Sequence, residues 1–263
     1  NAVLLGGYVY QQHMAVLRLL DLLDNRHPVS AVRLEDSTPI DDKNLFDDIE
    51  VTLNDGRIHR FQVKWGFQQS FDSQLVSWQL ADFKNPSGTL YIVGLFNTWK
   101  AYLHFGNAPI CHLYTSKPAV KSLQVFFKTC QDAVPFEGKY CQLLPSFYDE
   151  LRKQDQTSIN REEFELFLEH FYLSFQQPGL AILDGTNGPE GEIKRLILSR
   201  IERLGLPESA YIKNLHLDAN ALYDMMCKIA SDANLSRMLI DQRLLQDRLG
   251  LDPTRGSIEQ PAQ

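Results

Sequence analysis

The stretch "DDIEVTLNDGRIHRFQVKW", residues 47–65, alternates apolar and polar side chains on both sides of a short polar segment that contains glycine. This pattern is typical of a β-hairpin that buries one face. Because successive side chains of a strand point to opposite faces, a one-residue slip would expose a whole apolar set. The stretch therefore predicts a hairpin whose register is set by its apolar residues.

The register follows when the two apolar sets are placed on one face. Ile49 then faces Phe61, and the loop consists of the three residues from Asn54 to Gly56. Gly56 is expected to adopt the left-handed conformation of a G1 bulge. A two-residue turn at Asp55 and Gly56 would break the apolar pattern, so the three-residue loop is predicted.

On the polar face, the same register places Asp48 opposite Gln62, with Lys64 one step further along. Facing Cβ atoms in such a pair lie about 5 Å apart. Carboxylate and amide oxygens suit Mg²⁺, which lowers the pKa of bound water and neutralises charge on a phosphate. The lysine can orient or deprotonate that water and stabilise the developing charge. These residues therefore predict part of a metal-dependent phosphodiester site.

The polar face has an alternative interpretation. Asp48 and Lys64 would then form a solvated ion pair, which contributes little to stability. Glu50, opposite Arg60, is interpreted as a surface pair of that kind.

The flanking sequence predicts further helices and strands. Helices are predicted over residues 10–25, 72–83 and 118–134. Strands are predicted over residues 29–34, 89–96 and 109–116. The last two are almost continuously apolar, which is typical of strands buried on both faces.

Strand signals become sparse after residue 145, where apolar residues recur at helical spacing. The sequence therefore predicts an α/β core over residues 1–145 and a helical subdomain or connector over 146–250. Residues 251–263 are polar and are interpreted as a tail or linker.

Composition narrows the class of protein. The chain has 263 residues, of which 44% are hydrophobic, and a net charge of −7. This acidic balance argues against a free-standing nucleic-acid coat, although a local basic groove remains compatible with it. The four cysteines are widely spaced without a zinc-binding pattern, so reduced cytoplasmic thiols are expected. No apolar run is long enough to predict a membrane span.

Five motifs occur in a fixed order: "GGYVYQ" (6–11), "LED" (34–36), "DDIEV" (47–51), "QVKW" (62–65) and "HLYTSKPA" (112–119). Their order resembles the PD-(D/E)xK restriction-endonuclease-like superfamily. Within it, the chain is most similar to the double-stranded-DNA endonuclease effectors of bacterial antiphage systems, found in CBASS effectors and at the N-termini of STAND-type NTPases. The resemblance covers residues 6 to about 135 and extends more loosely to about 230.

The resemblance assigns roles to individual residues. Asp48 matches the acidic metal ligand, and Lys64 matches the catalytic lysine. Gln62 stands where the superfamily more often has Asp or Glu, a Q-x-K variant of the hairpin. Glu35 matches an upstream acidic residue, so Asp48, Gln62 and Glu35 are the expected metal ligands.

Two further residues are expected beside the site. Gln11 matches the "YQ" of the first helix, with an ordinary surface or capping glutamine as the alternative. Lys117, after "LYTS", is a candidate for contacting a phosphate, with an ordinary solvated lysine as the alternative. His13 is the histidine expected nearest to the site.

The resemblance implies a restriction-endonuclease-like core, with a central mixed sheet flanked by helices, followed by an α-helical region. It also implies a Mg²⁺-dependent endonuclease, with Mn²⁺ able to substitute, that cuts double-stranded DNA with little sequence preference. The expected setting is the bacterial cytoplasm, with activation by homo-oligomerisation and a fused or associated sensor or NTPase module. The alternative is a nuclease-like module that binds nucleic acid or protein without catalysis.

Overall fold

The computed structural model describes residues 2–34, 46, 48–64, 78–87, 91–103, 108–130, 135–136, 139–153, 159–175, 192–209, 217–232, 235 and 238–251. The strands are β1 Val29–Leu34, β2 Ile49–Leu53, β3 Ile58–Lys64, β4 Ile110–Thr115, β5 Phe127–Cys130, β6 Tyr140–Leu143, β7 Phe171–Ser174 and β8 Leu239–Asp241. The helices are α1 Ala2–Leu23, α2 Leu80–Lys84, α3 Ile92–Leu103, α4 Lys121–Gln124, α5 Ser146–Arg152, α6 Arg161–Glu169, α7 Glu192–Arg203, α8 Leu206–Ser209, α9 Ala219–Ala230 and α10 Gln242–Leu249.

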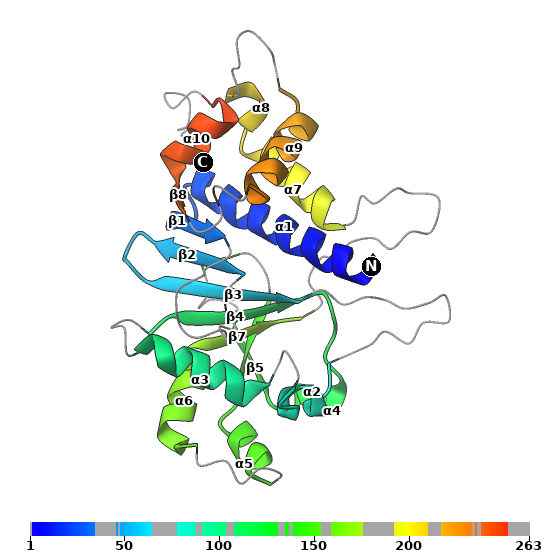
Figure 1. Ribbon diagram of the computed structural model, residues 1–263, viewed down its shortest axis with the longest axis vertical. Helices are drawn as coiled ribbons and strands as arrows, with labels where there is room; N and C mark the ends of the chain where they lie inside the picture. Colours follow the sequence, from blue (N-terminus) through cyan, green and yellow to red (C-terminus); the bar gives the residue numbers. More distant parts are fainter. Residues whose placement is uncertain are drawn as a thin grey trace, which may run out of the picture.

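In this part of the chain, eight strands form one mixed sheet in the order β5-β6-β7-β4-β3-β2-β1-β8. β3, β4 and β7 are parallel neighbours, and the other strand pairs are antiparallel. Helices α1, α7, α9 and α10 cover one face, and α3 and α6 cover the other (Figure 1). The predicted α/β fold with a central mixed sheet flanked by helices is confirmed at this level.

The hairpin has the predicted register. Ile49 pairs with Phe61, and the loop is closed by a bond of 2.9 Å from the N–H of Leu53 to the carbonyl of Arg57. Gly56 has a φ of 84°, the left-handed conformation that glycine adopts without a Cβ clash. The three-residue loop with glycine last is therefore confirmed.

The two faces of β3 enter different cores. Phe61 and Val63 pack in the core that contains α1. Gln62 lies beside its register partner Leu113, which packs in the core that contains α3. Side chains at alternate positions of β3 are therefore separated by the sheet, as a strand requires.

The predicted helix over residues 10–25 is confirmed as α1, which begins at Ala2 and ends at Leu23. Its residues from His13 to Leu22 are all buried, because the sheet covers one side and α7 and α9 cover the other (Figure 1). A helix enclosed in this way is apolar around most of its circumference. This enclosure explains why the apolar stripe in the sequence is so wide.

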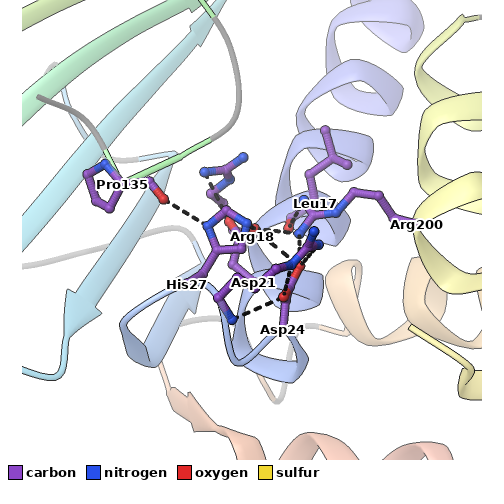
Figure 2. Close-up of polar contacts among 8 residues, drawn as sticks. Leu17, Arg18, Asp21, Asp24, His27, Pro135 and Arg200 are labelled. Carbon is purple, nitrogen blue, oxygen red and sulfur yellow. Dashed lines mark hydrogen bonds and ion pairs between the residues drawn. The ribbon is translucent and has the colours of Figure 1, made fainter. Parts of the chain in front are cut away.

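A buried ionic network joins α1 to α7 near the end of α1 (Figure 2). Asp21 contacts Arg18 at 3.0 Å and Arg200 at 2.8 Å, and all three side chains are almost completely buried. His27 extends the network through a 2.8 Å bond between Nδ1 and the carbonyl of Pro135. Buried charges are tolerated when they are paired, so the network holds this end of α1 in one position.

Two predicted elements are wrong. Residues 89–96 were expected to form a strand, but residues 92–103 form helix α3. Ile92, Leu95, Phe96 and Trp99 are all buried there at helical spacing. A short apolar run with a buried face does not by itself distinguish a helix from a strand.

The expected helix over residues 118–134 is the second correction. Helix α4 covers only Lys121–Gln124, and β5 follows at Phe127–Cys130. β5 pairs with β6, which begins at Tyr140. Aromatic residues and threonine favour a strand when a partner is available, and that partner lies outside the predicted segment. The short helix expected over 72–83 is described only from residue 78, where α2 begins at Leu80.

The sequence after residue 145 contributes to the same sheet. β7 lies between β4 and β6, and β8 pairs with β1 at the opposite end. Helices α5 and α6 belong to the α3 side, whereas α7, α9 and α10 belong to the α1 side. In the part of the chain that the structure describes, no helix is long and apolar enough to cross a membrane.

Candidate functional site

Asp48 lies directly before β2 and is half-buried. Its Oδ2 accepts a hydrogen bond of 2.6 Å from the backbone N–H of Val63 and another from Nε2 of Gln62. Its Oδ1 accepts a hydrogen bond from Nε2 of Gln11. Both carboxylate oxygens are therefore held in a defined orientation by β3 and α1.

Gln62 is buried with 3% of its surface exposed. The predicted juxtaposition with Asp48 is observed, because the hairpin register places the two residues opposite each other. The amide orientation is set by this bond, in which the nitrogen points to the carboxylate. A rotation of the amide would present its oxygen on the same side, where a cation can be coordinated.

Lys64 is the last residue of β3 and is half-exposed. Its register partner is Thr115, the last residue of the parallel strand β4. Ligands of open α/β sheets bind beyond the carboxyl ends of such strands.

Thr115 organises a second group at the same strand end. Its Oγ1 accepts hydrogen bonds from Nε1 of Trp78 at 3.1 Å and from the N–H of Lys117 at 3.2 Å. Nζ of Lys117 lies 4.3 Å from the centroid of the Trp78 ring. Burial lowers the pKa of Lys117, and the nearby charge of Asp82 opposes this effect. Lys117 is therefore a half-buried cation on an aromatic face rather than a freely solvated lysine.

Sequence reasoning missed Trp78 and Thr115. Trp78 lies in a segment that was expected to be a short helix, but it forms a β-bridge with Ala119. The N–H of Trp78 also bonds to the carbonyl of Pro118 at 2.8 Å. The sequence contains no signal for this pairing, because the two segments are about 40 residues apart.

The interpretation of Glu50 and Arg60 as a surface pair is wrong. The two residues form an ion pair, but only 5% and 6% of their side chains are exposed. Arg60 donates from Nη1 to the hydroxyl of Tyr102 at 2.9 Å, and its guanidinium lies 4.1 Å from that ring centroid. Tyr102 belongs to α3, so the element that covers this pair is the helix that was expected to be a strand.

Gln11 is not an ordinary surface or capping residue, because its amide contacts the carboxylate of Asp48. Glu35 lies outside the described residues. The structure thus brings together Gln11, Asp48 and Gln62.

The oxygen ligands at this position are of the types that a hard divalent cation prefers. Asp48 provides a carboxylate, and Gln62 provides an amide oxygen once its side chain rotates. Among the described residues, no group of three or more His, Cys, Asp or Glu side chains lies close enough to hold a metal. The third predicted ligand, Glu35, is not among them.

The candidate site therefore has two parts. The first is the carboxylate of Asp48 with the amides of Gln11 and Gln62. The second is Lys64 at the end of β3, with Lys117 and Trp78 beyond it. Such an arrangement can hold a cation and contact an anionic substrate. A scan against models of known protein families finds no match to this chain, and a search of curated proteins finds none either.

Proposed function

We propose that the protein is a metal-dependent endonuclease that hydrolyses phosphodiester bonds in double-stranded DNA with little sequence preference. The observation that carries the proposal is the Asp48 carboxylate, held by Gln62, Gln11 and the N–H of Val63 at the edge of the sheet where Lys64 ends β3. A fixed carboxylate beside an amide and a half-exposed ammonium suits hydrolysis of a phosphate ester.

Each residue has a defined task in this proposal. Asp48 and Gln62, with Glu35, hold Mg²⁺ or Mn²⁺, which when bound supplies an acidified water and neutralises phosphate charge. The ammonium of Lys64 orients the attacking water and stabilises negative charge on the phosphate oxygens. Gln11 keeps the carboxylate of Asp48 in its orientation by donating to Oδ1.

Lys117 and Trp78 provide the proposed contact with the nucleic-acid backbone. A cation held against an aromatic ring is positioned to attract a phosphate group. Thr115 fixes both groups through its hydroxyl. Contacts with the DNA backbone carry no sequence information. We therefore expect DNA cleavage to show weak sequence preference and strong salt dependence.

The order of the elements supports the proposal. Helix α1, strand β1, the β2–β3 hairpin and strand β4 follow each other as in the motifs that resemble PD-(D/E)xK nucleases. The resemblance to antiphage effectors extends the proposal to a cytoplasmic bacterial protein. In this proposal its activity depends on homo-oligomerisation and on a sensor or NTPase module.

The test is a plasmid-cleavage assay in Mg²⁺ and in EDTA, with wild type, Lys64→Ala and Lys128→Ala in parallel. Lys128 is an exposed lysine on β5, at the far edge of the sheet, and serves as the control for loss of one positive charge. We expect Lys64→Ala to slow cleavage at least about 100-fold, and Lys128→Ala to cut like wild type. Equal cleavage by Lys64→Ala, or cleavage by wild type in EDTA, contradicts the proposal.

A second candidate function is binding without catalysis. It is favoured by the bonds that Asp48 accepts on both oxygens, which satisfy the carboxylate without a cation. Titration calorimetry with Mn²⁺ separates the two functions. Heat of Mn²⁺ binding that is lost in Asp48→Asn supports the nuclease, whereas DNA binding with no Mn²⁺ binding and no cleavage supports the binding module.

A further inference from the structure

Two consecutive residues of α1 make polar contacts with α9. Nε2 of Gln12 donates to the carbonyl of Cys227 at 2.7 Å. Nε2 of His13 is hydrogen-bonded to the hydroxyl of Tyr223, and the two rings stack with centroids 5.7 Å apart. Burial, with a contribution from Lys194, lowers the pKa of His13 to about 4. The imidazole is therefore neutral at neutral pH, and its contact with α9 is a directional hydrogen bond between neutral groups.

The residue before them, Gln11, reaches the candidate site instead. An α-helix turns about 100° per residue, so Gln11 points about 150° away from the mean direction of Gln12 and His13. One turn of α1 is therefore bonded to α9 on one side and to Asp48 on the other. Movement of this turn relative to the sheet changes the contact with Asp48 directly.

The geometry makes that contact sensitive to a small tilt. The far end of α1 is held at Asp21 by its ionic network (Figure 2). Position 11 lies ten residues, or about 15 Å, from that anchor. A tilt of about 2° at Asp21 moves position 11 by about 0.5 Å, and hydrogen-bond lengths vary only over about 0.5 Å. A restraint near position 11 therefore helps to keep Gln11 on Asp48.

The apolar part of the α1–α9 contact is a less directional restraint. The buried residues of α9 include Leu222 and Met226, and apolar packing is non-directional. Met in particular adapts to small displacements of its neighbours. The bonds of Gln12 and His13 are directional contacts between α1 and α9.

We propose that Tyr223 and the Cys227 carbonyl of α9, acting through His13 and Gln12, position the Gln11 amide on the Asp48 carboxylate. The position of helix α9 therefore affects the candidate site. A displacement of α9 releases the Gln11 amide, which is one of the groups that orient Asp48. Tyr223 is a positioning residue and does not contact substrate. The inference rests on the proposed function only for its effect on cleavage.

The first experiment observes Gln11 directly and requires no activity. The side-chain amide resonances of Gln11 are recorded in ¹⁵N-labelled protein and assigned by their loss in Gln11→Ala. Tyr223→Phe removes the hydroxyl and keeps the ring, so we expect the Gln11 signals to move toward the position of a solvent-exposed amide. Tyr140→Phe is the matched control, because its buried hydroxyl has no hydrogen-bond partner among the described residues. We expect the control to leave the Gln11 signals unchanged.

The second experiment asks whether Tyr223 acts through Gln11. We expect Tyr223→Phe to lower kcat for DNA cleavage about fivefold, which corresponds to the loss of about one hydrogen bond, with KM unchanged. In a Gln11→Ala background, the same exchange should have no further effect on kcat, because the two residues act in series. Gln12→Ala, at a half-buried position, provides a second variant that breaks the other bond to α9.

The outcomes separate this inference from the proposed function. Unchanged Gln11 signals in both Tyr223→Phe and Gln12→Ala overturn the inference. Independent, multiplying losses of kcat in the double variant also overturn it. If wild type cuts no DNA but the Gln11 signals move in Tyr223→Phe, the proposed function fails and the positioning contact stands.

Discussion

Mild acid should destabilise the protein through buried histidines. Nδ1 of His59 and Nε2 of His112 are 2.8 Å apart, in a hydrogen bond that already contains one proton. A further proton must bind Nε2 of His59 or Nδ1 of His112, and both atoms are buried without a hydrogen-bond partner among the described residues. Burial, together with the charge of Arg57, lowers the pKa of His59 to about 3. Burial also places the pKa of His112 well below its usual value.

The direction of the pH effect on stability follows from comparing the folded and unfolded states. An unfolded histidine binds its proton near pH 6.5, whereas folded His59 does so near pH 3 and folded His13 near pH 4. Below pH 6.5 the unfolded chain therefore binds more protons, and the free energy of unfolding falls as the pH falls. At pH 5 the loss is about 2 kcal/mol for His59 and about 2 kcal/mol for His13. His112 acts in the same direction.

This loss is large compared with the total stability of about 5–15 kcal/mol that is typical of a protein domain. Burial raises the pKa of Asp24, but hydrogen bonds from Arg26 outweigh it and lower that pKa to about 2. The contribution of Asp24 is therefore lost only below about pH 4. The contribution of Asp24 is therefore constant between pH 7 and pH 5, where the contributions of His59 and His13 change.

The assay is urea denaturation at pH 7, 6 and 5, monitored by circular dichroism. We expect the free energy of unfolding to fall by at least about 4 kcal/mol across the series. His13→Gln can still donate to Tyr223, so it should fold and reduce the pH slope by about one proton. A free energy of unfolding that is the same at pH 7 and pH 5 would refute the reasoning, as would an unchanged slope in His13→Gln.

Two further predictions concern the hairpin, and both are measured by urea denaturation at pH 7. Glu50→Gln removes the carboxylate charge that pairs with the buried guanidinium of Arg60, so it should destabilise the protein by about 3 kcal/mol. Glu163→Gln, in a half-exposed pair with Lys100, is the control and should cost less than about 1 kcal/mol. Equal effects would contradict burial of the Glu50–Arg60 pair. In Gly56→Ala, the added Cβ meets open space, but the alanine must adopt a φ of 84°. The free energy of unfolding should therefore fall by about 1 kcal/mol. An unchanged free energy of unfolding would contradict the left-handed turn.

The sequence by itself determined the hairpin and the contact between Asp48 and Gln62. Both follow from the two-residue period of a strand, which acts between neighbours along the chain and leaves one register that buries the apolar set. Helix α1 and strands β1 and β4 were also predictable, because each has a long or strongly patterned apolar signal.

The tertiary structure decided the remainder. Residues 92–103 form a helix that packs in a core with distant segments, and Phe127–Cys130 form a strand that pairs with β6. That helix buries the Glu50–Arg60 pair, which the local pattern had placed in solvent. Gln11 on Asp48 and Lys117 on Trp78 are likewise contacts between segments far apart in the chain. Periodicity records which face of an element is apolar, but which element comes to cover that face depends on non-local packing.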